Sequence, residues 1–425
     1  MTEDRRPHSL LWVLSELYYP EETSTGYYLT KLAEGLAARR PVRVVCGQPS
    51  YSNRGMRAPR DEVHNRVAIH RCWATTWNKD HLALRLVNLL TVSFSLVTYL
   101  LLHLRHGDRV LVVTNPPLLP FLVDWVCRMR GARCFLRVED VYPEALGAAG
   151  LLSRHSRLAR FLERRVRRLY RSVERIIVLG RDASKLVEGK LPPSLTAKLA
   201  VITNWADIDS APHIARHENP LLARLGLGDH FVVQYSGNLG RTHNIAAIVS
   251  CAERLRHEPG IHFLVIGSGA KWAWLEQCIQ SRSLQNVSLL RPCPRSELAT
   301  SLNACDLSII PFVEGMAGVS VPSRMYNVMA AGKPLIAMAD HDSELARVVK
   351  EEGVGWVVPP DDIEGFARAV IEARSQPQRL QQMGRRAQRA VEQKYRLKSI
   401  LEKYERLLDE ALGEQERADR RRAAA

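Results

Sequence analysis

The alternation of strand and helix signals, repeated in both halves of the chain, constrains the fold more than any other feature of the sequence. Short β-branched and aliphatic runs alternate with longer segments whose apolar residues recur at helical spacing. A weakly periodic stretch between about residues 207 and 230 interrupts this pattern, which then begins again. Because parallel strands are joined by long crossover connections, usually helices, the pattern predicts two α/β domains with doubly wound parallel sheets.

The expected elements fill both halves of the chain. In the first half we expect strands at residues 9–14, 42–46, 67–72, 110–114, 133–138, 175–179 and 200–203, and helices at residues 27–38, 118–129 and 153–172. In the second half we expect strands at residues 231–235, 262–266, 287–290, 307–310, 334–337 and 355–358, and final helices from about 363 to 416. We place one domain at residues 1–205, a second at 206–390, and a helical segment with a frayed basic tail at 391–425.

Positive charge is concentrated in the first half. Residues 1–200 contain 32 Lys and Arg against 18 Asp and Glu, whereas the remaining residues contain 28 against 27. This asymmetry predicts that the first domain meets an anionic partner, such as a membrane surface or a phosphorylated substrate. No zinc-finger spacing or RNA-binding motif is present, so nucleic acid is not an expected partner.

The cysteines and the N-terminus indicate a cytoplasmic protein. The eight cysteines are scattered without a C-x-x-C pair, which is typical of reduced thiols. The first residues lack the organisation of a signal peptide. His213 and His217 have the i,i+4 spacing of metal ligands without a third partner, and two Asp-x-Asp pairs, at 207–209 and 340–342, lie in acid-rich turns, so we expect no bound metal.

Two segments of the first domain are candidates for contact with a membrane. Residues 86–104 carry no formal charge, which fits a half-buried domain helix, a helix that docks on a membrane, or a transmembrane span. A span is disfavoured because the flanking strands are expected in one sheet. The arginine-rich helix at 153–172 is amphipathic, and its Arg164 and Arg168 are either solvated or bind anionic head groups.

Loops that follow expected strands carry the candidate binding residues. Gly237, Gly240 and Arg241 follow a strand and precede a helix, which fits either a phosphate-binding turn or a structural one. Residues 315–334 combine a loop with a helix that begins near Arg324, and Ser320 or Ser323 is expected to cap that helix. Two such turns in one domain favour a diphosphate site.

In the first domain, carboxylates follow a strand in the segment VEDVYPE. Asp140 and Glu144 lie where ligands bind in open α/β sheets, although a helix cap with a first-turn acid would look the same. Glu21 and Glu22 precede Gly26 in an analogous loop.

The motifs and their order resemble those of GT-B glycosyltransferases of family 4, in particular the branch that makes bacterial exopolysaccharide and O-antigen sugars of the colanic-acid type. The resemblance rests on YYPEETSTG, VEDVYPE, TNWADID, YSGNLGRTHN, FLVIGSGA, NVSLL, LNACDLSIIPF, GVSVPSRMYNVMAAGKPLIA and DSELA, which span about residues 10–400. It implies two Rossmann-like domains that face each other across a cleft, with a last helix that crosses back to the first domain. It also implies retention of anomeric configuration without a metal or other cofactor.

The resemblance assigns roles to particular residues. It implies that Gly237, Gly240 and Arg241 hold the donor diphosphate. The loop that closes over the phosphates contains Ser320, Pro322, Ser323 and Arg324. Asp140 and Glu144 become the candidate catalytic residues. Apart from the resemblance, we take Gly26, Arg164 and Arg168 as candidate residues for the acceptor or the membrane.

The chain departs from the family pattern at two places. The usual pair of glutamates spaced E-x7-E is replaced by Val319 and Asn327, so that Asn327 would meet the ribose hydroxyls without a charge. A lysine that commonly follows the glycine-loop arginine is missing, because Ala246 and Ala247 occupy that stretch. Arg324 is the candidate for the second positive charge.

We therefore expect a retaining glycosyltransferase, peripherally attached to the inner face of the cell membrane. It would transfer a sugar from a nucleotide-sugar, with UDP favoured over GDP, to a polyprenyl-diphosphate-linked acceptor of surface-polysaccharide synthesis. Two alternatives stay open at this point. One is a soluble transferase or epimerase of the same fold, and the other is a non-catalytic membrane-associated partner that has lost the donor site.

Overall fold

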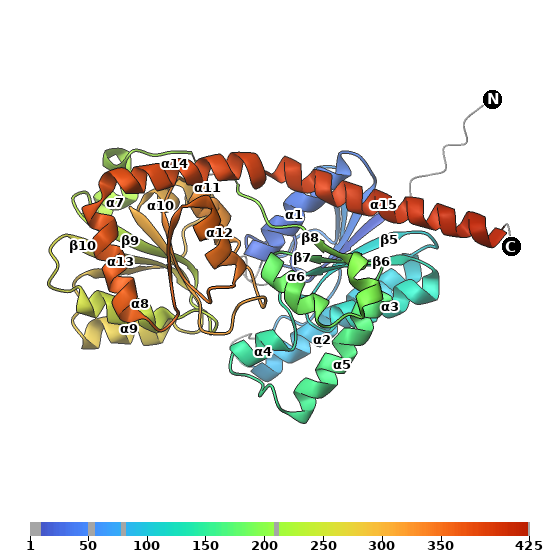
Figure 1. Cartoon of the computed structure of the whole chain (residues 1–425). Helices are drawn as coiled ribbons and strands as arrows, with labels where there is room; N and C mark the ends of the chain where they lie inside the picture. Colours follow the sequence, from blue (N-terminus) through green and yellow to red (C-terminus); the bar gives the residue numbers. More distant parts are fainter. Residues whose placement is uncertain (1–9, 50–55, 78–81, 208–211, 424–425) are drawn as a thin grey trace.

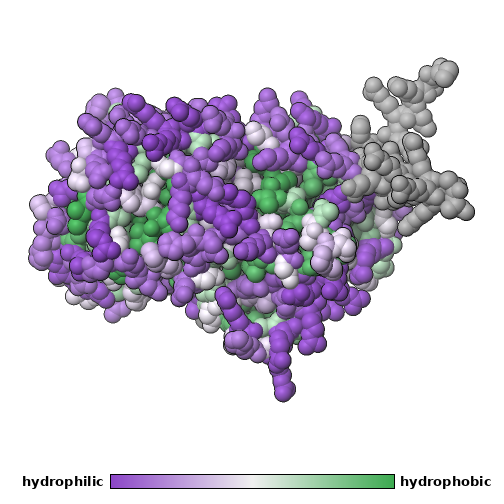
Figure 2. Space-filling model, in the orientation of Figure 1, coloured by the Kyte–Doolittle hydropathy of each residue, from purple (hydrophilic) through white to green (hydrophobic). Residues whose placement is uncertain are grey.

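The computed structural model contains two α/β domains, each built on one sheet (Figure 1). The structure describes residues 10–49, 56–77, 82–207 and 212–423. Hydrophilic side chains dominate the face shown in Figure 2, with hydrophobic residues in patches between them. The expectation of two doubly wound parallel sheets is confirmed.

The first sheet has the strand order β3-β4-β2-β1-β5-β6-β7-β8, and only β3 runs antiparallel to its neighbour. Its strands are β1 (Leu11–Leu14), β2 (Val42–Cys46), β3 (Asp61–His64), β4 (Val67–Arg71), β5 (Arg109–Val113), β6 (Arg133–Val138), β7 (Arg175–Val178) and β8 (Leu199–Val201). Strand β3 was not expected, because its sequence DEVH has a single apolar residue and lies exposed at the sheet edge.

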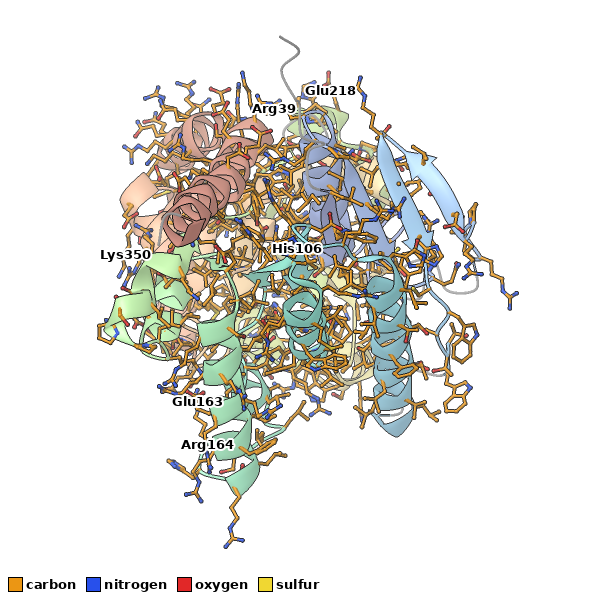
Figure 3. All side chains as sticks on the ribbon, turned by 90° about the vertical axis from the view of Figure 1, so that its right-hand side faces the viewer. Arg39, His106, Glu163, Arg164, Glu218 and Lys350 are labelled. Carbon is orange, nitrogen blue, oxygen red and sulfur yellow. The ribbon has the colours of Figure 1, made fainter. Side chains whose placement is uncertain are left out.

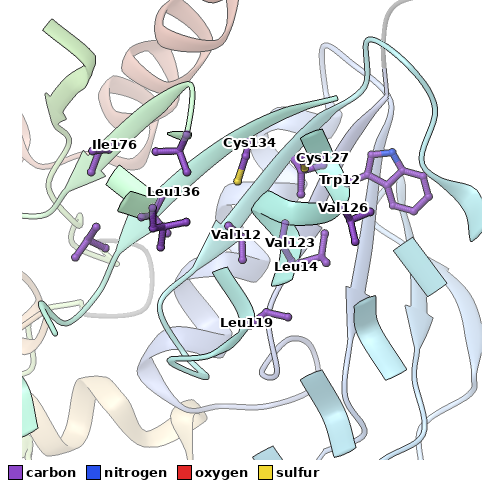
Figure 4. Close-up of a cluster of buried hydrophobic side chains, with 14 of the residues drawn as sticks. Trp12, Leu14, Val112, Leu119, Val123, Val126, Cys127, Cys134, Leu136 and Ile176 are labelled. Atoms are coloured by element: carbon purple, nitrogen blue, oxygen red, sulfur yellow. The ribbon is translucent and has the colours of Figure 1, made fainter. Parts of the chain in front are cut away.

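Helices cover both faces of the first sheet, which explains its continuous apolar strands. They are α1 (Ser24–Ala37), α2 (Leu82–His103), α3 (Leu119–Arg130), α4 (Glu144–Ala148), α5 (Arg157–Ser172), α6 (Arg181–Glu188) and the 3-10 turn η1 (Pro193–Lys198). Trp12 and Leu14 of β1 face a cluster that contains side chains of α2, α3 and α5 (Figure 4). Leu11 and Val13 face the opposite cluster, with α1.

The second sheet has the order β11-β10-β9-β12-β13-β14 and is entirely parallel. Its strands are β9 (Phe231–Asn238), β10 (Ile261–Ser268), β11 (Val287–Leu290), β12 (Leu307–Pro311), β13 (Leu335–Met338) and β14 (Gly355–Val358). The helical elements around it are η2 (Arg216–Glu218), α7 (Pro220–Leu225), α8 (Ile245–Arg254), α9 (Trp272–Ser281), η3 (Arg295–Glu297), α10 (Leu298–Asn303), α11 (Arg324–Ala330), α12 (Glu344–Glu352) and α13 (Ile363–Ser375).

The C-terminal helices join the two domains. Helix α14 (Pro377–Lys394) packs on α11 of the second domain, and α15 (Leu397–Ala423) packs on α1 of the first (Figure 1). Buried Ile400, Tyr404 and Leu408 of α15 belong to the same cluster as the strands of the first sheet. The tail that we expected to fray continues α15 through Ala423.

Helix α2 is half-buried against the first domain. Its flanking strands β4 and β5 lie in one sheet, which a transmembrane crossing between them would not permit. In the part of the chain that the structure describes, its Leu86–His103 segment is the one helix long and apolar enough to cross a membrane, and a third of it is buried. Val92, Leu96 and Leu100 face the core, whereas Leu90 and Phe94 are exposed.

Candidate active site

The carboxyl ends of strands from both sheets meet where the two domains touch. Asp140, which follows β6, forms an antiparallel bridge with Ser320 in the loop between β12 and α11. The Val141 N–H donates to the Val319 carbonyl oxygen at 3.0 Å. In open parallel sheets, ligands bind at the carboxyl ends of the strands, at the point where the strand order reverses. The order reverses between β1 and β5 in the first sheet and between β9 and β12 in the second. This contact is therefore the candidate site.

The loop after β9 requires glycine at position 237. Gly237 has a φ of +150°, and a Cβ there would overlap the guanidinium of Arg324. A Cβ at Gly240 would lie 2.9 Å from Nδ2 of Asn238. Arg241 is exposed, and no hydrogen bond or ion pair among the described residues holds its guanidinium. The loop thus places a free cation at the end of β9.

Arg324 lies in the space that Gly237 leaves. Its Nη1 donates to the Ser236 carbonyl oxygen at 3.2 Å, and its Nη2 donates to Nε2 of His243 at 3.0 Å. The guanidinium carbon is 4.9 Å from the centre of the Tyr235 ring. No carboxylate of the described ranges forms an ion pair with it. An arginine held by neutral groups at a strand end can bind an anionic ligand.

The loop with Ser320, Pro322 and Ser323 is held by the first domain. The Ser323 hydroxyl lies 2.7 Å from that of Ser24 in α1, and the Gly318 N–H donates to Asp182 at 2.9 Å. Ser323 occupies the N-cap position of α11, but its side chain makes no capping bond, which corrects the expectation of a serine cap. Its helical backbone conformation differs from that of a usual N-cap, and its hydroxyl bonds across the domain contact instead.

Asn327 contacts the segment that links the domains. Its Oδ1 accepts a hydrogen bond from the backbone N–H of Asp207 at 2.8 Å. The Asp207 carboxylate in turn accepts from Tyr27 of α1 and from Arg295. The amide that stands in place of the family's second glutamate therefore fixes the linker.

The pKa of Asp140 lies closer to neutral pH than that of an ordinary aspartate. Burial raises the pKa of Asp140 to about 6, opposed by a hydrogen bond from Ser320 and reinforced by the charge of Glu139. The Asp140 N–H donates to the Thr114 hydroxyl at 3.2 Å, which fixes the backbone at the end of β6. Such a carboxyl can stabilise a developing positive charge or exchange a proton.

Glu144, the second candidate catalytic residue, lies in a buried ion-pair network. Its Oε1 is 2.7 Å from Nζ of Lys190, which also lies 2.6 Å from Glu163 of α5. The side chain of Lys190 is 3% exposed, so its charge depends on these ion pairs for compensation. In this structure Glu144 joins α4 to α5 and α6.

The three candidates for acceptor or membrane contact lie apart from one another. Gly26 is buried in the first turn of α1, where a Cβ would lie 2.8 Å from the Glu21 carbonyl oxygen. Arg164 and Arg168 are exposed on α5, and Figure 3 shows Arg164 projecting from that helix away from the body of the domain. Gly26 therefore permits close packing of the loop that precedes α1, and the arginines belong to a surface.

Two functional candidates were not found from the sequence. His243 and Lys271 come together only because the loops after β9 and β10 are adjacent, and the Lys271 ammonium donates to the His243 carbonyl oxygen at 2.6 Å. Their position just after predicted strands was the available signal. Within the described ranges, no group of three or more His, Cys, Asp and Glu side chains is arranged to hold a metal ion.

Comparison with known proteins identifies the class. Residues 24–205 match the glycosyl transferase 4-like domain, and residues 223–390 match the glycosyl transferases group 1. Together with the two facing parallel-sheet domains, these matches define a GT-B glycosyltransferase. The chain belongs to the family-4 glycosyltransferases, in the branch of exopolysaccharide and O-antigen synthesis.

Relatives and solved structures agree with that assignment. The chain is 30% identical over 381 residues to the probable glycosyltransferase WbjE of Pseudomonas aeruginosa, covering 85% of this chain and 88% of that one. It is 24% identical to the putative colanic acid biosynthesis glycosyl transferase WcaI of Escherichia coli, covering 84% and 90%.

Among solved structures, a sucrose-phosphate synthase of Thermosynechococcus elongatus has a TM-score of 0.74 at 17% identity, covering 95% of this chain and 99% of that one. HepE of Anabaena with UDP-glucose has a TM-score of 0.72 at 14% identity, covering 95% and 100%. These likenesses show the shared fold.

Proposed function

We propose that this protein is a retaining glycosyltransferase that moves a sugar from a nucleoside-diphosphate donor to a polyprenyl-diphosphate-linked acceptor at the cytoplasmic face of the membrane. The observation that carries the proposal is the placement of charge at the domain contact. Arg241 and Arg324 lie at the ends of second-domain elements without an acidic partner among the described residues, and Asp140 of the first domain lies in the same contact region. Cations on one domain and a carboxyl on the other suit transfer from a diphosphate.

The proposed chemistry uses these charges. The bond between the anomeric carbon and the diphosphate oxygen breaks through an oxocarbenium-like state, and the guanidinium groups stabilise the departing diphosphate. The acceptor hydroxyl attacks from the same face, and its proton passes to the leaving phosphate oxygen. Ionised Asp140 stabilises the positive charge that develops on the sugar. No strong protein base is needed in this scheme.

The proposed donor carries uridine, and the proposed reaction needs no divalent cation. HepE, which has the same fold, binds UDP and UDP-glucose according to its solved complexes. Arg241 and Arg324 would supply the positive charge that a metal ion supplies in other transferases. The corresponding expectation is that chelation by EDTA leaves the transfer rate unchanged.

The proposed membrane surface lies on the first domain. Helix α2 exposes Leu86, Leu90 and Phe94, with Phe94 73% exposed. Helix α5 exposes arginines, including Arg164 and Arg168, next to exposed Phe161. Helix α3 packs against both α2 and α5, so all three helices lie on one side of the sheet. A face that combines apolar and basic side chains is typical of surfaces that bind an anionic bilayer. Such a surface would bring the first domain to an acceptor whose diphosphate lies at the head-group level.

The first test is thermal stabilisation by UDP, GDP, ADP and dTDP without added metal. A ligand at about 100 times its dissociation constant stabilises the folded state by roughly 2.7 kcal/mol. We expect UDP to raise the melting temperature of the wild type and to have little effect on the variant Arg241→Ala. The control variant is Arg385→Ala, an exposed arginine on α14 of the second domain. Sugar transfer to a polyprenyl-diphosphate-linked acceptor would then be measured with and without EDTA.

The contact between Asn327 and Asp207 favours a second candidate, a non-catalytic partner protein. Because Asn327 Oδ1 already accepts a hydrogen bond from the linker, fewer of its hydrogen-bonding groups are left to meet a ribose. If none of the four nucleotides stabilises the wild type, the transferase proposal fails and the non-catalytic function takes its place.

A further inference from the structure

His243 is a buried residue that touches two cations of the candidate donor site. It follows the glycine loop directly and is 8% exposed. Its Nε2 lies 3.0 Å from Nη2 of Arg324, and its carbonyl oxygen accepts from Lys271 at 2.6 Å. The imidazole packs against Phe312, with 5.3 Å between ring centres. One residue therefore contacts both Arg324 from α11 and Lys271 from the loop after β10.

The contact with Arg324 fixes the chemical state of His243. A guanidinium has only donors, so Nε2 of the imidazole accepts and the ring proton resides on Nδ1. Nδ1 then faces the Thr242 hydroxyl at 3.4 Å. Burial, together with the charges of Arg324 and Lys271, lowers the pKa of His243 to about 2. The ring is neutral at physiological pH and serves as a fixed acceptor for Arg324.

Lys271 lies just after Gly269, where β10 leads into α9. Its backbone N–H donates to the Leu239 carbonyl oxygen at 3.0 Å, so the glycine loop and the lysine are held together. Burial, and then the charge of Arg241, lowers the pKa of Lys271, which places these two cations within electrostatic reach of each other. No carboxylate of the described residues forms an ion pair with Lys271. Three cations without acidic partners thus surround one loop.

We propose that Lys271 is a third cation for the donor diphosphate, beside Arg241 and Arg324. We also propose that His243 is a positioning residue, whose imidazole holds Arg324 and whose backbone carbonyl holds Lys271. The inference rests on the proposed function and adds two residues to its donor site. Lys271 would replace the family lysine that is missing at Ala246 and Ala247. The replacement comes from the neighbouring strand end rather than from the same loop.

The experiment compares binding of probes with and without phosphate. Dissociation constants are measured by calorimetry for UDP, uridine and inorganic pyrophosphate. The variants are Lys271→Met, which keeps the apolar stem, His243→Phe, which keeps the ring but removes the acceptor, and His243→Gln, which restores an acceptor. The control is Lys350→Met, an exposed lysine on α12.

We expect Lys271→Met and His243→Phe to weaken binding of UDP and pyrophosphate at least tenfold and to leave uridine binding unchanged. His243→Gln should recover part of the loss, and Lys350→Met should behave as the wild type. The inference is overturned if UDP binding is unchanged in Lys271→Met and His243→Phe. It is also overturned if uridine binding falls equally, because that result means that the loop has collapsed.

The outcome for the wild type separates this inference from the proposed function. If the wild type binds pyrophosphate through Lys271 but binds no nucleoside diphosphate, the anion site stands and the nucleotide-sugar function fails. If the wild type binds UDP and the variants bind it equally well, the proposed function stands and only the roles of His243 and Lys271 fail. If the wild type binds neither probe, both are wrong.

Discussion

Gly237 has no side chain, and the Arg324 guanidinium occupies the space where a Cβ would lie. Its backbone φ of +150° is unfavourable for residues with a Cβ, and the space beside it is filled by the Arg324 guanidinium. A glycine in a strand-to-helix turn is compatible with many functions. Its particular role here depends on α11, which is distant in sequence and adjacent in space.

The first residue-scale prediction concerns that glycine. Gly237→Ala should strain the backbone and displace Arg324, costing on the order of 1–3 kcal/mol and most of the nucleotide-induced stabilisation. Thermal unfolding with and without UDP measures both effects. The matched control is Gly228→Ala, because a Cβ at Gly228 meets no atom within 4 Å. Equal behaviour of the two variants would contradict the packing of Arg324 on Gly237.

The second residue-scale prediction concerns the titration of Asp140. Because burial raises its pKa to about 6, the folded state binds more protons than the unfolded state between about pH 4 and 6. This contribution to stability is therefore lost as the pH rises through that window. Asp140→Asn should be more stable than the wild type at pH 8, on the order of 1–3 kcal/mol, and nearly equal to it at pH 4.

Thermal unfolding across this pH range tests the prediction, and a difference that does not vary with pH would contradict it. Sugar transfer adds a second readout. Asp140→Asn should lower the transfer rate and leave the dissociation constant of UDP within a few fold, since Asp140 lies on the first domain, across the contact from the cations of the donor site.

At the scale of elements, the exposed residues of α2 and α5, which lie on either side of α3, form the proposed membrane surface. The double variant Arg164→Glu and Arg168→Glu should weaken binding to vesicles that contain anionic lipid at least tenfold, because each charge near the surface contributes about 1 kcal/mol. The matched control is Arg385→Glu with Arg389→Glu, an exposed pair of the same spacing on α14 of the second domain.

Vesicle sedimentation at low and moderate salt measures the binding. Phe94→Asp on α2 should reduce binding to neutral and anionic vesicles alike, since it removes apolar contact and not positive charge. If the control pair weakens binding as much as Arg164 and Arg168 do, the attraction belongs to the net charge of the chain and not to this surface.

The elements themselves were largely predictable. Runs such as Val110–Val113 and Phe263–Ile266 are apolar throughout because both faces of each sheet are covered by helices. Strand β3 was missed because an exposed edge strand needs no apolar run. The apolar segment 86–104 was ambiguous, since length and composition alone do not distinguish a half-buried helix from a membrane helix.

At the scale of the whole molecule, α15 holds the C-terminus on the first domain through a buried arginine. Arg137 of β6 is 1% exposed and donates to the Tyr404 hydroxyl at 3.1 Å, to Asn204 at 2.7 Å and to Glu139 at 2.7 Å. The strand that leads to Asp140 is thereby tied to the last helix. A shift of α15 would therefore displace Arg137 and Glu139, which directly precedes Asp140.

The prediction at this scale is that Tyr404→Phe lowers stability by about 1–2 kcal/mol, because a buried guanidinium loses one hydrogen bond. Arg137→Met should cost more, since it leaves the carboxylate of Glu139 without its buried partner. Thermal unfolding of both variants measures the losses. Unchanged stability in Tyr404→Phe would show that the other contacts of α15, which include its apolar residues and the ion pair between Arg40 and Asp409, hold the helix in place.

The sequence by itself determined the two parallel sheets, the family and the glycine and arginine positions at the end of β9. These features depend on periodicity and on residues close together in the chain. The tertiary structure decided which groups meet: Arg324 with Gly237, Asn327 with Asp207, Glu144 with Lys190, and His243 with Lys271. Such contacts depend on the order of strands and the packing of the two domains, which local sequence patterns do not specify.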